Sequence, residues 1–181
     1  MNSDLGINIF KEKMNITLIG MPGVGKSSIG KHLAKILNFT FFDSDRIIEK
    51  NSKSSLQQII DSYGADALLD LEKEIIVNLG NFDKHVLCPG GSVVYSAEAM
   101  LFLKSNSRVI FLDAGLEDIK ARILDMAVRG IVGLKGDNFS ELYTQRLPLY
   151  EKYADIRINL SANSNVEQNS QKIIKVIFPH S

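Results

Sequence analysis

The chain has 181 residues, enough for one domain with a substantial core, and its 45% hydrophobic and 23% charged residues are ordinary for a globular protein. Lys+Arg and Asp+Glu both number 21, so no overall field favours nucleic acid or an anionic membrane. The single cysteine, Cys88, excludes an internal disulfide, and we expect a buried structural thiol there. Without an apolar span or signal-peptide core, the chain is expected to be cytoplasmic, with residues 1–13 as a flexible extension before one domain at 14–181.

Short apolar runs alternate with helical patterns along this domain. The predicted strands are Ile16–Ile19, Thr40–Phe42, Val86–Cys88, Val109–Leu112 and Ile156–Leu160. The predicted helices cover 26–37, 54–62, 66–79, 97–104, 116–127, 139–153 and 165–176. Strands interleaved with helices favour an α/β three-layer sandwich, in which helices flank a five-stranded parallel sheet. Ligands of such sheets bind at the carboxyl ends of the strands, where we therefore expect the functional residues.

The segment Gly20-Met21-Pro22-Gly23-Val24-Gly25-Lys26-Ser27-Ser28 follows the first strand and matches the phosphate-loop pattern G-x-x-x-x-G-K-[ST]. Glycines let such a loop fold around a triphosphate, with the helix N-terminus behind it. Lys26 is expected to reach the β- and γ-phosphates, and the Ser27 hydroxyl to ligate Mg²⁺. The alternative is a glycine-rich turn that binds nothing, but the amphipathic helix that follows favours a nucleoside triphosphate site.

Asp43 and Asp45 follow the second strand. If the chain stays extended there, both side chains point into the cleft, so that one carboxylate assists Mg²⁺ and the other accepts a proton from a substrate hydroxyl. The alternative is that one of them caps the next helix.

Three later features also lie at predicted strand ends or in loops. Gly90-Gly91 allows close approach of a ligand, although a plain tight turn gives the same pattern. Residues 129–137 contain three glycines and are expected to form a mobile lid, with an ordinary surface loop as the alternative. Arg129 and Arg146 are candidates for contact with phosphate or carboxylate, whose geometry a guanidinium matches.

Together these motifs resemble the shikimate kinase family of small P-loop kinases. The likeness extends from Met14 to about Ser161 and rests on the phosphate loop, Asp43-Ser44-Asp45, Pro89-Gly90-Gly91, Arg122 seven residues before Arg129, and Arg146-Leu147-Pro148-Leu149-Tyr150.

The resemblance implies an ATP- and Mg²⁺-dependent kinase that phosphorylates a hydroxyl group of a small metabolite, most simply shikimate to shikimate 3-phosphate in aromatic amino-acid biosynthesis. It implies catalytic roles for Lys26, Asp45 and Arg129. It assigns nucleotide binding to Gly20, Gly23, Val24, Gly25, Lys26, Ser27, Ser28 and Arg122. It assigns the acceptor to Asp45, Gly90, Gly91 and Arg146, and the metal to Ser27 and Asp43.

Two residues depart from the family pattern on the acceptor side. Leu69 stands where the family has an arginine that helps hold the shikimate carboxylate, and Pro89 replaces the first glycine of a triplet. A related kinase of another small polyol or hydroxy acid therefore stays open. So does a nucleotide-binding accessory protein without turnover, although the second carboxylate and the lid arginine speak against it. A monomer with a small-molecule substrate is expected.

Overall fold

The computed structural model describes residues 14–80, 82–124, 130–134 and 138–179. Its strands are β1 (Ile16–Ile19), β2 (Thr40–Asp43), β3 (His85–Cys88), β4 (Arg108–Asp113) and β5 (Ile156–Asn159). Its α-helices are α1 (Lys26–Leu37), α2 (Ser44–Ser52), α3 (Leu56–Tyr63), α4 (Ala65–Val77), α5 (Ala97–Asn106), α6 (Leu116–Leu124), α7 (Phe139–Tyr153) and α8 (Val166–Ile177), with a short 3₁₀ helix, η1 (Val93–Tyr95).

The five strands form one parallel sheet in the order β2-β3-β1-β4-β5. After β1 the chain moves toward β2, whereas after β3 it crosses β1 to reach β4. The connections thus leave β1 and β3 in opposite directions, which creates the crevice where ligands of such sheets bind. The phosphate loop follows β1 directly and lies at this crevice.

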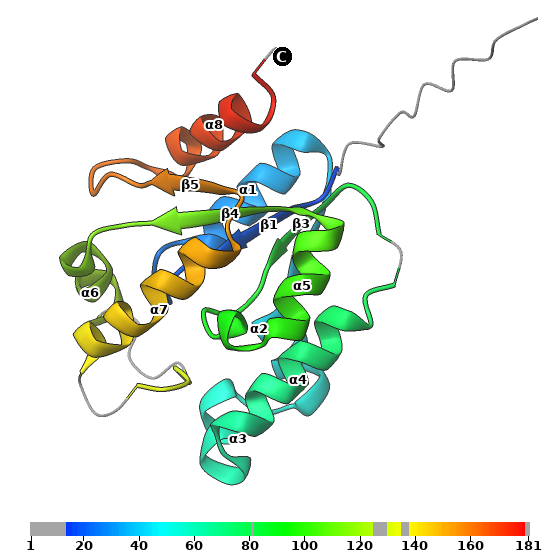
Figure 1. The fold of residues 1–181 in the computed structure, drawn as a ribbon, viewed down its shortest axis with the longest axis vertical. Coiled ribbons are helices and arrows are strands. Elements are labelled where there is room, and N and C mark those ends of the chain that lie inside the picture. Colours follow the sequence, from blue (N-terminus) through cyan, green and yellow to red (C-terminus); the bar gives the residue numbers. More distant parts are fainter. Residues whose placement is uncertain (1–13, 81, 125–129, 135–137, 180–181) are drawn as a thin grey trace, which may run out of the picture.

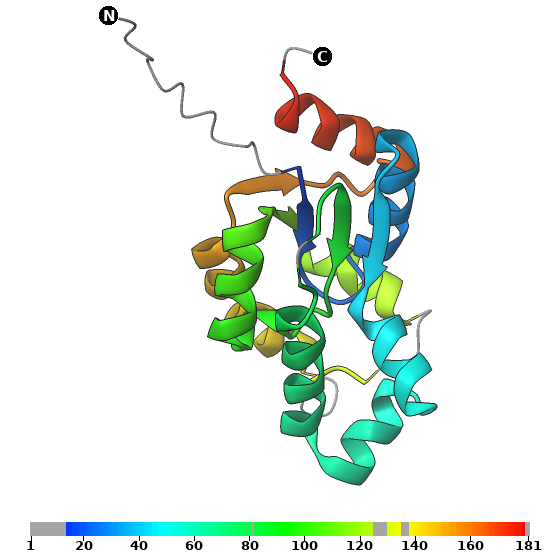
Figure 2. The ribbon, with the colours of Figure 1, turned by 90° about the vertical axis from the view of Figure 1, so that its right-hand side faces the viewer.

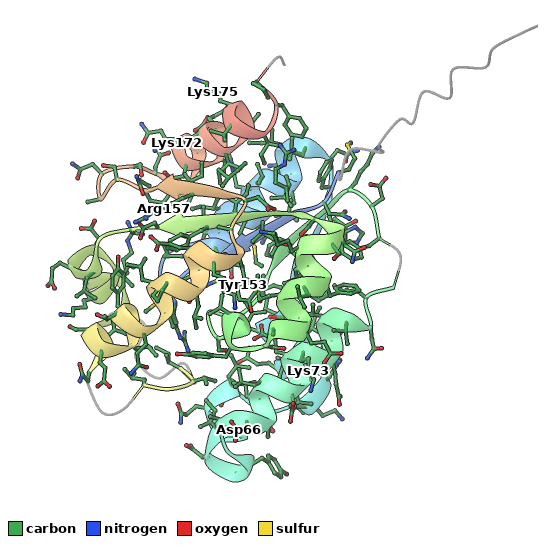
Figure 3. The ribbon with its side chains drawn as sticks, viewed as in Figure 1. Asp66, Lys73, Tyr153, Arg157, Lys172 and Lys175 are labelled. Carbon is green, nitrogen blue, oxygen red and sulfur yellow. The ribbon has the colours of Figure 1, made fainter. Side chains whose placement is uncertain are left out.

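Helices cover both faces of the sheet, which confirms the predicted three layers. Figure 2 shows α1 on one side of the sheet and α5 and α7 on the other. The helices α2, α3 and α4 project together beyond one end of the sheet, and α8 lies toward the other end (Figure 1). The labelled side chains of Asp66 on α4 and Lys175 on α8 mark these opposite ends (Figure 3).

Sequence periodicity located all five strands and the helices α1 and α3 to α8, with small differences at their ends. It did not place a helix at 44–52. Helix α2 is strongly polar and buries only Ser44 and Ile48, so its apolar pattern is too sparse to be read. The predicted extension at 1–13 lies outside the described residues.

Two apolar clusters hold these elements. The larger one lies between the sheet and its covering helices and includes the buried thiol of Cys88, as expected. The smaller one joins α2, α3 and α4 to the described part of the predicted lid, residues 130–134. Its buried members are Ile48, Leu56, Ile59, Leu68 and Val132. Along the described residues, no helix has the length and apolar character needed to span a membrane.

Candidate active site

A pocket of about 480 Å³ lies at the carboxyl ends of β1, β2 and β3. Most of the residues that the sequence motifs singled out line it. They are Gly23, Gly25, Lys26, Ser27, Ser28, Asp43, Asp45, Gly90, Gly91 and Arg146. The remaining wall mixes polar and apolar residues, and the smaller cluster contributes Ile48, Leu56, Leu68 and Val132 to it.

The phosphate loop has the conformation that its glycines permit. Gly20, Gly23 and Gly25 have φ values of 149°, 81° and 106°, which side-chain-bearing residues rarely adopt. A Cβ atom on Gly20 would stand 2.5 Å from the carbonyl oxygen of Leu112. Helix α1 begins at Lys26, so its N-terminal amides and the positive end of its dipole face the loop. This arrangement suits a bound phosphate group.

Lys26 is held inside the loop rather than in solvent. Its side chain is 9% exposed, and Nζ donates to the carbonyl oxygens of Gly20 at 2.9 Å and Met21 at 3.2 Å. Burial lowers the pKa of Lys26, while the nearby carboxylate of Asp45 favours its charged form. The ammonium group is therefore pre-positioned at the mouth of the loop.

Asp43 and Asp45 both line the pocket, but not along an extended chain as the sequence predicted. Asp43 ends β2 and caps α2, since its Oδ1 accepts a bond from the Arg46 amide at 3.2 Å. Asp45 belongs to the first turn of α2. The capping alternative is thus correct for Asp43, and it is the start of the helix that turns Asp45 into the pocket.

Asp45 has the electrostatic setting of a general base. Burial and the negative charge of Glu72 raise its pKa to about 7, and the ammonium group of Lys26 counters part of that rise. A carboxylate with a pKa near neutrality accepts a proton more readily than an ordinary aspartate.

Glu72 also lines the pocket, although the sequence motifs predict no role for it there. Its carboxylate is 3% exposed, and Oε1 accepts bonds from Ser44 Oγ and the Gly90 amide, each at 2.6 Å. Burial raises the pKa of Glu72, although these two bonds favour the charged form. The sequence contains one signal for this role. Glu72 falls between Leu68 and Ile76 on the buried face of α4, and a charged residue is rarely buried unless it is paired or functional.

Gly90 and Gly91 lie where no side chain fits. A Cβ atom on Gly90 would stand 2.7 Å from Asp45 Oδ1 and 3.0 Å from Glu72 Oε1. On Gly91 it would stand 2.8 Å from the Pro22 ring and 3.1 Å from Arg146 Nη1. The carbonyl oxygen of Gly91 is also fixed, because it accepts a 2.6 Å bond from the Tyr150 hydroxyl. The glycines thus bring the backbone between the carboxylates and the guanidinium group.

Arg146 is fully buried on α7, with 0% exposure. Nη2 donates to the carbonyl oxygen of Val132 at 2.6 Å, and Nε to the Tyr95 hydroxyl at 3.3 Å. Nη1 has no hydrogen-bond partner within the described part of the chain. A buried cationic donor without a partner loses the free energy of its hydration, so an anionic acceptor group that entered the pocket and accepted a bond from Nη1 would be bound favourably.

The expected lid and nucleotide arginines are only partly described. Within the described segment 130–134, Gly130 and Val132 lie against α3, and a Cβ atom on Gly130 would stand 2.7 Å from the Gln57 amide nitrogen. Arg129 and residues 135–137 lie outside the described residues. Arg122 donates from Nη1 to the carbonyl oxygen of Val24 at 3.2 Å. Gly20 and Val24 belong to the loop and Arg122 contacts it, but none of the three is in the described wall of the pocket.

Leu69, the departure on the acceptor side, is partly buried and packs against the smaller apolar cluster. It does not line the pocket, whereas its neighbour Leu68 does. Arg46 lines the pocket with a side chain that is 67% exposed, and its Nε lies 3.9 Å from Asp43 Oδ2. Arg146 is therefore the one buried guanidinium in the described wall of this pocket.

Comparison with known proteins gives a consistent result. The family model described as shikimate kinase matches residues 22–178. The shikimate kinase of Paracidovorax citrulli is 36% identical over 165 residues, covering 89% of this chain and 90% of that protein. That of Prochlorococcus marinus is 38% identical, covering 87% of this chain and 81% of that protein. The structure of shikimate kinase from Acinetobacter baumannii in complex with shikimate superposes with a TM-score of 0.86 and 27% identity, over 95% of this chain and 97% of the other.

Proposed function

The chain belongs to the shikimate kinase family, and we propose that it transfers the γ-phosphoryl group of ATP to a hydroxyl group of shikimate, giving shikimate 3-phosphate. One observation carries this proposal. A single pocket joins a phosphate loop to the half-buried carboxylate of Asp45 and to the buried guanidinium of Arg146, one nitrogen of which has no hydrogen-bond partner among the described residues. Shikimate offers a hydroxyl group to Asp45 and a carboxylate to Arg146.

We assign the nucleotide to the loop half of the pocket. The amides at the start of α1 surround the phosphates, and the Lys26 ammonium exchanges its carbonyl partners for β- and γ-phosphate oxygens. The same ammonium then neutralises charge that develops on the transferred group. Arg122 and the lid residue Arg129 are proposed to contact the nucleotide on the strength of the family resemblance alone.

The pocket also suits Mg²⁺. Ser27 and Asp43 both line it, and a hydroxyl with a carboxylate is the oxygen donor set that this ion prefers. When bound, Mg²⁺ would neutralise phosphate charge. The Asp43 carboxylate has oxygen lone pairs left for this role, since among the described residues it accepts one capping bond and makes one long ion pair.

We assign the acceptor to the half of the pocket between α2, α4 and α7. Asp45 accepts the proton of the attacking hydroxyl, and Gly90 and Gly91 allow the ring to approach the backbone. Arg146 Nη1 binds the carboxylate and so fixes which hydroxyl faces the γ-phosphate.

The protein is further predicted to act as a cytoplasmic monomer.

One observation favours a second candidate. Leu69 adds apolar surface where the family has an arginine, so a carboxylate here has fewer cationic partners. A kinase of another small polyol or hydroxy acid fits this change as well.

An acceptor panel distinguishes the two candidates. ADP release is measured with shikimate, quinate, gluconate and nucleoside monophosphates, each with and without Mg²⁺. We expect shikimate to give the highest kcat/KM. A higher value with another acceptor would support the second candidate. Nucleotide binding without stimulation by any acceptor would overturn both in favour of an accessory protein.

A further inference from the structure

The Arg146 guanidinium is held by two of its three nitrogens. Nη2 donates to the Val132 carbonyl at 2.6 Å, and Nε to the Tyr95 hydroxyl at 3.3 Å. Because a guanidinium is a rigid plane, fixing two nitrogens also fixes the direction of the third. The third, Nη1, is the nitrogen that has no hydrogen-bond partner among the residues that the structure describes.

Tyr95 makes a second contact with the same group. The Arg146 Cζ atom lies 5.1 Å from the centre of the Tyr95 ring, within the range of a cation–π interaction. The phenol thus both accepts the Nε–H bond and supports the guanidinium through its ring. These contacts restrict rotation of the group about its side-chain axis.

Tyr95 acts from outside the pocket. It ends η1, a few residues after Gly91, and is not among the residues of the pocket wall. Tyr95 is 39% exposed, and its hydroxyl lies 3.8 Å from the Cβ position of Gly133 in the described segment 130–134. Because Tyr95 is not in the described wall of the pocket, we expect it to influence the reaction through Arg146, which is in that wall.

We propose that Tyr95 is a positioning residue that aims Arg146 Nη1 at the acceptor carboxylate and thereby determines selectivity for carboxylate-bearing acceptors. The inference rests on the proposed function, because it needs a carboxylate in the acceptor. It bears on this chain in particular, since Leu69 leaves Arg146 as the one buried guanidinium of the described pocket wall. With one anchor in place of two, its orientation decides how well the carboxylate is bound.

The test compares Tyr95→Phe, which keeps the ring, with Tyr95→Ala, which removes ring and hydroxyl. Tyr63 provides a matched control, because it is 77% exposed at the end of α3, and Tyr63→Ala removes the same side chain there. Each protein is assayed with shikimate and with its uncharged carboxamide, and KM for ATP and the thermal midpoint are recorded alongside.

We expect Tyr95→Phe to raise KM for shikimate about threefold, as for one lost hydrogen bond. Tyr95→Ala should raise it about tenfold or more, because the ring contact is lost too. The carboxamide should show much smaller changes, so the preference for shikimate over its carboxamide falls. KM for ATP should not change, and Tyr63→Ala should match the wild type.

Three results would overturn the inference. In the first, KM for shikimate stays at the wild-type value in both Tyr95 variants. In the second, shikimate and carboxamide are affected equally, which indicates a general structural role. In the third, KM for shikimate rises equally in Tyr95→Phe and Tyr95→Ala, and the thermal midpoint of both variants falls well below that of the wild type, which indicates a loss of folding stability and not of positioning. If the wild type itself shows no acceptor-dependent turnover, it is the proposed kinase function that fails. This result differs from the three above, in which the wild type is active and only the role of Tyr95 is refuted.

Discussion

Replacing Leu69 with arginine restores the group that this chain lacks on its acceptor side. Leu69 and Glu72 are one turn apart on α4, so a guanidinium at position 69 lies beside the Glu72 carboxylate. Leu69 packs on the cluster that supplies part of the pocket wall, and we expect the longer arginine side chain to extend from there toward the acceptor. We expect Leu69→Arg to bind shikimate more tightly than the wild type.

The size of the effect follows from the new contact and the lost one. A hydrogen bond to a charged group contributes about 1.5–3 kcal/mol, which corresponds to a KM for shikimate lowered about tenfold to a hundredfold. The half-buried leucine loses apolar contacts worth about 1 kcal/mol of the free energy of unfolding. In a chain of this length such a loss lowers the Tm by about 2–4 °C.

The assay measures KM for shikimate and for ATP separately, with the thermal midpoint of each protein. Leu71→Arg is the matched control, because Leu71 is 37% exposed on the same helix and points about 160° away from Leu69, almost to the opposite face. The control should leave KM for shikimate unchanged. A Leu69→Arg protein that melts normally but shows an unchanged or higher KM for shikimate would refute the reasoning and favour a different acceptor.

Three further predictions concern buried groups. Lys26→Met should lower kcat by about a hundredfold to a thousandfold, because it removes a donor to the transferred phosphoryl group; a steady-state rate near that of the wild type would contradict this. Gly90→Ala should lower kcat by about a hundredfold, since its methyl group would stand 2.7 Å from Asp45 Oδ1, while binding of a fluorescent ATP analogue persists. Full activity would show that the backbone at Gly90 shifts to accommodate the methyl group without cost. In Glu72→Gln, urea unfolding should show the stability of the variant relative to the wild type increasing as the pH rises above about 4.5. Burial raises the pKa of Glu72 in the folded wild type, so ionisation of this carboxyl favours the unfolded state as the pH rises, whereas the glutamine variant has no such group. A stability difference between variant and wild type that stays flat or falls with pH would be inconsistent with that shift.

The fold was predictable because its apolar runs are strongly patterned. Strand β1 is buried at every position, as central strands of parallel sheets are, and α1 carries a clear apolar stripe through Ile29 and Leu33. Helix α2 was not placed, because its nine residues are mostly polar and their position depends on packing against α3 and α4. Local pattern does not encode such packing.

The site was predictable where a motif fixes local geometry. The phosphate loop carries its own conformation in its glycines, so Lys26 and Ser27 follow from the sequence. Glu72 contacts Ser44 and Gly90, which are 28 and 18 residues away in the chain. The Tyr95 contact spans 51 residues. These partners come together only when α4, η1 and α7 are assembled, and no spacing rule reports them.

Phosphoryl transfer itself is the most direct test of the account. The purified protein is incubated with Mg²⁺, shikimate and ATP labelled in the γ-phosphate, and the products are separated. We predict label in shikimate 3-phosphate with the wild type, and its loss with Asp45→Asn, which keeps the shape of the side chain but cannot accept the proton. Label that stays in ATP, or appears only as inorganic phosphate, would contradict the proposal that this pocket joins the two substrates.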